Sequence, residues 1–159
     1  MNLPNGLAAF IAAVFLGSTA AYSETYKESF ECTFGRGVAN RPTPVRLVFS
    51  VDEFGRSASL HEVDIPKVDT TRGHGIISSD SIRRLSFSWF GRDYTYSATG
   101  LSAPQNGASA RTVDLQTVEY SFFLNRRTMK AAVRSEDLGE SIPLYGNAQG
   151  TCQPISTLK

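Results

Sequence analysis

Apolar side chains recur at every second residue along much of this 159-residue chain, and that period restricts the fold to β-structure. Alternate side chains of a strand point to opposite faces, so a period of two gives one apolar and one polar face. In the first such segment the apolar face would carry Tyr26, Phe30, Cys32 and Phe34. The alternation returns at residues 45–51, 57–64, 118–124 and 129–133. No stretch of about ten residues shows the apolar stripe of a helix.

Turn-forming residues separate these segments at intervals of about 8–15 residues, a spacing typical of small antiparallel sheets. We therefore expect an all-β fold of about eight or nine short strands, arranged as a single antiparallel β-barrel or β-sandwich. The sequence contains neither an internal repeat nor a linker, so residues 24–159 should form one domain.

A transmembrane barrel is the alternative to a barrel or sandwich in water. It is disfavoured because the polar faces of the expected strands carry charges that would be costly against lipid. These charged residues are Lys27, Glu31, Arg46, Arg84 and Glu119. We expect that residues 24–159 do not insert into a membrane.

The N-terminal residues 1–23 contain no Lys, Arg, Asp or Glu. An apolar run from Leu7 to Leu16 precedes the small residues 17–21, which is the order found in secretory signal peptides. A membrane anchor is disfavoured because about ten apolar residues fall short of the roughly 20 that a spanning helix needs. We expect a signal peptide over residues 1–23 and export to the periplasm or the extracellular space.

Two cysteines, Cys32 and Cys152, lie near the two ends of the expected domain. In an oxidising compartment an even number of cysteines most simply forms a disulfide. A shared metal ion is the alternative, but no further Cys or His lies nearby at ligand spacing. We therefore expect one terminal disulfide, Cys32–Cys152, that staples the first strand to the last.

The charges nearly balance, with 16 basic and 15 acidic residues and a formal net charge of +1. This balance gives no electrostatic reason to expect nucleic-acid binding. The sequence has no phosphate-binding glycine loop and no zinc or calcium spacing, so we expect no cofactor and no metal. We expect a monomer.

An aromatic hairpin is expected over residues 85–96, with Gly91-Arg92 as a two-residue turn. Its register sets the large aromatic residues on one apolar face, in the pairs Phe87–Tyr96 and Trp89–Tyr94. Phe90 falls on the opposite face. An exposed Phe90 next to Arg92 would suit an interface with a partner.

A second hairpin is expected over residues 118–133, with residues 125–128 as a four-residue loop. Its register forms the pairs Leu124–Met129, Phe122–Ala131 and Tyr120–Val133. The loop holds Arg126 and Arg127, which could meet an acidic partner or an anionic surface. A solvated pair of turn residues is the simpler interpretation.

Residues 66–75, 97–110 and 146–147 are rich in turn formers and are expected to be loops or turns. His74 lies in the first of these, whereas His61 lies in an expected strand. A solvated loop histidine is the simpler interpretation of His74, but it could act as a base if a carboxylate and a hydroxyl converged on its imidazole. No Gly-x-Ser-x-Gly motif occurs, and the paired acids fall in turns. We expect no enzymatic activity.

Three functions are consistent with these observations. The first is a non-catalytic exported β-domain that binds a protein or a cell-envelope component. The second is a lipocalin-like carrier of a small apolar ligand, which requires an interior cavity of roughly 300–1,000 Å³. The third is a hydrolase using His74.

The segments Phe30-Glu31-Cys32 and Gly150-Thr151-Cys152-Gln153 enclose a β-rich exported domain and resemble those of small periplasmic lysozyme inhibitors. The resemblance implies a compact β-barrel stapled near its termini. The Ser-Gly-x-x-Tyr loop by which one such family plugs a muramidase site has no counterpart, since Tyr96-Ser97-Ala98-Thr99-Gly100 does not fit it. No functional residue is therefore carried over.

Overall fold

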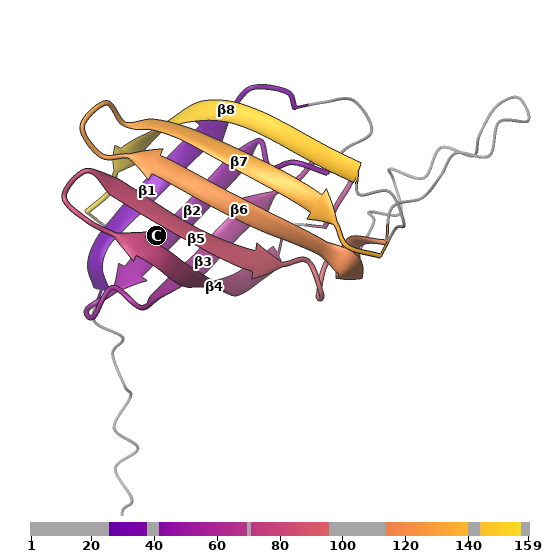
Figure 1. Ribbon diagram of the computed structural model, residues 1–159, viewed down its shortest axis with the longest axis horizontal. Helices are drawn as coiled ribbons and strands as arrows, with labels where there is room; N and C mark the ends of the chain where they lie inside the picture. The colour runs from indigo at the N-terminus through magenta and orange to yellow at the C-terminus, as the bar shows by residue number, and fades with distance from the viewer. Residues whose placement is uncertain (1–25, 38–41, 70, 96–113, 140–143, 157–159) are drawn as a thin grey trace, which may run out of the picture.

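Eight strands form one closed antiparallel barrel in the computed structural model, which describes residues 26–37, 42–69, 71–95, 114–139 and 144–156 (Figure 1). The strands are β1 (Tyr26–Phe34), β2 (Arg46–Asp52), β3 (Ser57–Asp64), β4 (Thr71–Asp80), β5 (Arg84–Phe90), β6 (Val118–Asn125), β7 (Lys130–Asp137) and β8 (Leu144–Pro154). Each strand pairs with the next, and β8 returns to β1. The predicted all-β class is confirmed, and of the two architectures the chain adopts the barrel.

The expected signal peptide (1–23) and the expected loop 97–110 lie outside the described residues. The structure therefore bears on neither prediction. A short 3-10 helix (Leu115–Thr117) precedes β6, and Asp114 caps it by accepting a hydrogen bond from the Gln116 amide.

The interior of the barrel is packed with aromatic side chains. The large ones come from β1, β2, β5 and β6, and they are Phe30, Phe34, Phe49, Phe87, Trp89, Tyr120 and Phe122. The rings of Phe87 and Phe122 stack with centroids 4.7 Å apart, and Phe49 lies 4.9 Å from Phe87. Such ring pairs attract beyond the burial of their area, so this stack forms the centre of the core.

The disulfide joins the first strand to the last, as predicted. Cys32 lies directly opposite Cys152 in the ladder between β1 and β8, and their sulfur atoms are bonded. The covalent bond is thus placed at the pair of strands that closes the barrel.

Two strands that the sequence predicted only in part complete the barrel. Residues 71–80 form β4, although 66–75 was predicted to be a loop, and 146–147 lie inside β8 rather than in a turn. Both strands place glycines where the others place apolar side chains. Gly75 pairs with Ala58, and Gly150 lies between Phe34 and Ala131. The small residues leave room for the aromatic side chains of neighbouring strands.

The predicted hairpin over residues 85–96 is wrong. β5 pairs with β4 and β6, so Trp89 lies opposite Tyr120 and Phe87 opposite Phe122. The chain after β5 turns at Gly91, whose amide bonds to the carbonyl of Val118. Tyr94 is nevertheless buried, and its hydroxyl accepts a 2.8 Å hydrogen bond from the indole of Trp89. Tyr96 lies outside the described residues.

The hairpin of β6 and β7 exists, but its register differs from the prediction by two residues. Leu124 lies opposite Ala131, and Asn125 opposite Lys130. The loop comprises residues 126–129, because Met129 adopts a left-handed backbone conformation (φ 55°) and belongs to the turn. A shift of two residues keeps each side chain on its predicted face, so the core assignment is unchanged.

Candidate interaction surface

The structure separates the four residues that sequence reasoning proposed for binding. Phe90 ends β5 opposite Glu119, near the start of β6, whereas Arg126 and Arg127 follow the end of β6. The two pairs therefore lie at opposite ends of the barrel. At the first end, the Arg92 guanidinium lies 5.1 Å from the centre of the Phe90 ring, and Phe90 is exposed.

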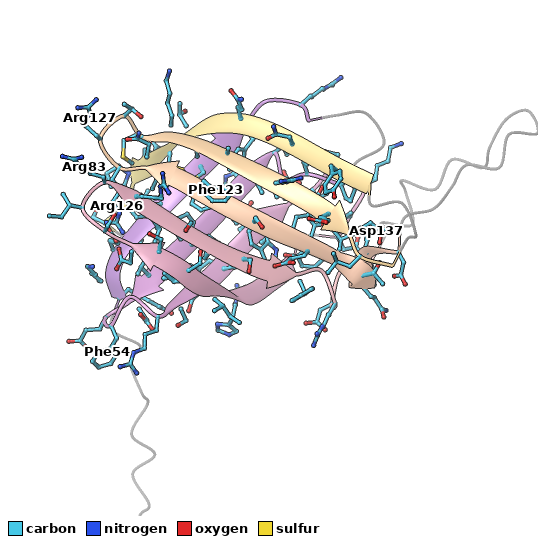
Figure 2. All side chains as sticks on the ribbon, viewed as in Figure 1. Phe54, Arg83, Phe123, Arg126, Arg127 and Asp137 are labelled. Carbon is cyan, nitrogen blue, oxygen red and sulfur yellow. A yellow bond between two sulfur atoms is a disulfide. The ribbon has the colours of Figure 1, made fainter. Side chains whose placement is uncertain are left out.

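The other end of the barrel gathers three turns, which we call the hairpin end. They are residues 53–56 between β2 and β3, 81–83 between β4 and β5, and 126–129 between β6 and β7. Figure 2 shows Phe54, Arg83, Arg126 and Arg127 at this end, with Asp137 at the other.

An ionic cluster fixes the hairpin end. Arg126 donates to both carboxylate oxygens of Glu28, at 2.5 and 2.8 Å, and to Asp80 at 2.7 Å. Lys27 reaches the other oxygen of Asp80 at 3.0 Å. The side chains of Arg126 and Asp80 are only 16% and 14% exposed, so solvent screens this pair weakly. The cluster thus ties β1 and β4 to the loop after β6.

A backbone hydrogen bond and one close packing contact connect the three turns. The Arg126 amide donates to the carbonyl of Arg83 at 3.0 Å. Gly55, at φ 67°, packs so closely on Asp80 that an added Cβ would lie 2.4 Å from its Oδ2. The turns therefore form one connected surface rather than three independent tips.

The turn between β2 and β3 is closed by Asp52. Its carboxylate accepts hydrogen bonds from the amide of Arg56, at 2.7 Å, and from the amide and hydroxyl of Ser57. Desolvation by burial acts to raise the pKa of Asp52, but these hydrogen bonds and one from the Gly55 amide together outweigh it and lower the pKa. The carboxylate is therefore held in its charged form.

Exposed cations lie near the ionic cluster of Arg126, Glu28, Asp80 and Lys27. Arg83, Arg84, Arg127 and Lys130 are exposed, and no carboxylate among the described residues forms an ion pair with them. Arg126 differs, because its guanidinium forms ion pairs with Glu28 and Asp80. We therefore assign Arg126 to holding the hairpin end together and Arg127 to its exposed surface.

Two exposed apolar side chains at the hairpin end were missed by sequence reasoning. Ile82 is 94% exposed and Phe54 75% exposed, and each lies at the tip of a turn. The Arg56 guanidinium lies 5.7 Å from the centre of the Phe54 ring. The available signal was an apolar residue in a turn next to arginine, as in Ile82-Arg83-Arg84. Beside Ile82, an open hollow of about 730 Å³ is lined in part by Met129 and Ile155.

A second exposed apolar residue lies on the side of the barrel. Phe123 is 47% exposed on the outer face of β6, between Ser86 and Ala132 (Figure 2). Open hollows of about 420 and 600 Å³ flank it. The charged residues that line these hollows are Arg83, Arg84, Lys130 and Arg134, so the surface around Phe123 is cationic and continues to the turn that holds Arg83.

The histidines do not assemble a catalytic site among the described residues. His74 lies in β4 rather than in a loop, and it is exposed opposite Ser59. No hydrogen bond joins its imidazole to a described carboxylate or hydroxyl. His61 Nε2 lies 2.9 Å from Ser50 Oγ, which is 2.7 Å from Ser29 Oγ. This chain of hydrogen bonds connects three strands, and Ser50 at its centre is fully buried, so the Ser50 hydroxyl is not accessible as a nucleophile.

Within the described part of the chain, no group of three or more His, Cys, Asp or Glu side chains is placed to hold a metal ion. No helix there is long and apolar enough to cross a membrane.

Comparison with known protein families, with curated proteins and with solved structures finds no match for this chain.

Proposed function

We propose that this protein is a non-catalytic exported binding domain whose hairpin end engages a negatively charged partner. The observation that supports this best is the contrast at residues 126 and 127. One arginine is bound by carboxylates and fixes the surface, and the next is exposed without a described carboxylate partner, alongside Arg83 and Arg84.

Local charge rather than net charge supports this partner class. The whole chain is almost neutral at +1. At the hairpin end, however, the acids Glu28, Asp80 and Asp52 already accept hydrogen bonds from other residues of the same chain. The exposed cations therefore dominate the field that an approaching partner meets, which favours association with negative charge.

Export is part of the same proposal. Disulfides persist in oxidising compartments and are rare where thiols are kept reduced. The Cys32–Cys152 bond supports a place outside the cytoplasm, in agreement with the secretory pattern of residues 1–23.

The carrier and the hydrolase receive no comparable support. Stacked rings occupy the centre of the barrel where a lipocalin-like ligand would bind, with Phe49 only 5.1 Å from Phe122. The imidazole of His74 lacks the described partners that a general base would need.

A pull-down tests the proposed function. The oxidised protein would be incubated with the extracellular and envelope fractions of its source, beside the double variant Arg83→Glu/Arg127→Glu. The matched control is Arg92→Glu, which reverses an exposed arginine at the opposite end. We expect an anionic partner to be retained by the wild type and the control, released by salt, and lost from the double variant. Equal capture by all three, or no capture, would contradict the proposal.

A further inference from the structure

We propose that the negatively charged partner is an anionic phospholipid surface, on which the hairpin end docks with Phe54 and Ile82 inserted between headgroups. Arg83 and Arg127 would then bind the phosphates. This inference rests on the proposed function and adds the chemical class of the partner.

The apolar tips favour lipid over an acidic protein. Side chains that are 94% and 75% exposed contact little of their own protein, and Ile82 and Phe54 project from two separate turns. A protein partner would need a matching apolar pocket for each tip. The headgroup region of a bilayer adapts to both, and apolar residues beside Lys or Arg are typical of surfaces that bind there.

The arginines supply the complementary charge. Within the part of the chain that the structure describes, the exposed charged residues of the three turns are Glu53, Arg56, Arg83 and Arg127, so the cations outnumber the acid. A guanidinium can donate two parallel hydrogen bonds to a phosphate, which is the geometry that a lipid headgroup offers. Anionic lipid also attracts each exposed cation electrostatically, within about one Debye length of the surface.

The connected turns make simultaneous contact possible. Gly55 packs on Asp80, and the Arg126 amide bonds to the Arg83 carbonyl, so the tips keep their relative positions. A preformed surface loses little conformational entropy on docking, because its side chains are presented by backbone that is already ordered.

Vesicle sedimentation tests the inference. The oxidised protein, purified from the export compartment of the expression host, would be mixed with vesicles of phosphatidylcholine alone or with about one quarter phosphatidylglycerol. We expect sedimentation with the anionic vesicles only, weakened by added salt. The double variants Phe54→Ser/Ile82→Ser and Arg83→Glu/Arg127→Glu should each lose at least about tenfold in affinity for the anionic vesicles.

Matched controls separate the hairpin end from general surface properties. Leu138→Ser removes an exposed apolar side chain at the other end of the barrel, and Arg92→Glu reverses a charge there. Both should bind anionic vesicles within about twofold of the wild type. All variants share the same N-terminus, so they do not differ in residues 1–23. Circular dichroism and the emission of Trp89, the single tryptophan, check that each variant is folded.

A tryptophan placed at a tip reports insertion directly. The fluorescence of Ile82→Trp should be quenched by brominated lipid in anionic vesicles, whereas that of Leu138→Trp, at the other end, should not. Absence of wild-type binding to anionic vesicles, or equal losses in the controls, would overturn the lipid assignment. If vesicles fail but an envelope protein is captured in a manner that depends on Arg83 and Arg127, the proposed function stands without lipid. If neither binds, both proposals fall.

Discussion

At the scale of single residues, the neighbours Arg126 and Arg127 show how one dipeptide can have two roles. Arg126 is folded back onto Glu28 and Asp80, while Arg127 is exposed to solvent. Sequence reasoning treated them as a pair, because only the barrel brings the acid of β1 and the acid of β4 to the same arginine.

Arg126→Ala is expected to lower the free energy of unfolding by about 1–3 kcal/mol. The substitution leaves the weakly exposed carboxylates of Glu28 and Asp80 close together with Lys27 as their remaining described cation. Urea unfolding followed by Trp89 fluorescence measures the change. Arg127→Ala, in the same loop, should change it by less than about 0.5 kcal/mol. Equal effects of the two substitutions would contradict the structural role given to Arg126.

Asp52 gives a prediction for pH. Burial acts to raise the pKa of Asp52 in the folded protein, but several hydrogen bonds together outweigh this effect and lower the pKa. A group with a lowered folded pKa stabilises the fold above its unfolded pKa, near 3.8, and this contribution is lost as the pH falls through the folded pKa. Asp52→Asn should therefore cost about 1 kcal/mol at pH 7 and progressively less below pH 3.8. Unfolding free energies measured at pH 7 and at lower pH would reveal a constant difference if this assignment is wrong.

At the scale of the strands, glycine takes inward positions in β4 and β8 opposite strands that carry large side chains. Gly75 packs against Phe87, and Gly150 approaches the Thr33 carbonyl. A strand whose inward positions are glycine shows no apolar alternation, and this is why the first half of β4, residues 71–75, was predicted to be a loop. The residues after Gly91 were predicted to pair with β5, whose partners in the barrel are β4 and β6.

Two glycines of β4 provide a matched pair of substitutions. A Cβ on Gly75 would lie 2.7 Å from Phe87 Cδ2, whereas a Cβ on Gly73 meets only Leu60 Cδ1 at 3.7 Å. Gly75→Ala should destabilise the barrel by about 1–3 kcal/mol, because Phe87 belongs to the central stack and must move. Gly73→Ala should be neutral or stabilise by up to about 1 kcal/mol. Thermal unfolding of both variants tests this order, and the reverse order would refute the packing explanation.

At the scale of the whole molecule, the barrel closes between strands that are 120 residues apart in sequence. The ladder of β1 and β8 and the disulfide share this position. In the chain-entropy model, a cross-link across a loop of about 100 residues lowers the entropy of the unfolded chain and so stabilises the fold by up to about 4.7 kcal/mol.

Cys32→Ser/Cys152→Ser should therefore lower the unfolding midpoint markedly under non-reducing conditions. The wild type should fall toward the same midpoint when it is unfolded in the presence of a reductant, and the double variant should not respond to the reductant. An unchanged midpoint in the double variant would show that the bond contributes nothing to stability.

The sequence by itself determined the fold class, the inward faces of six strands and the disulfide. These follow from local alternation and from cysteine number, which depend on the residues alone. The inward faces of β1, β2 and β6 were correct for this reason, and a register error of two residues between β6 and β7 left them intact.

The tertiary structure alone decided that the sheet closes into a barrel, that glycine-rich strands complete it, and which charges remain exposed. These properties depend on pairs of residues far apart in the chain, such as Phe87 with Gly75 and Arg126 with Glu28. The local sequence around a charged residue or a glycine does not identify the distant residue that it contacts. The hairpin end could therefore be recognised as a candidate surface only when its three turns had been brought together in space.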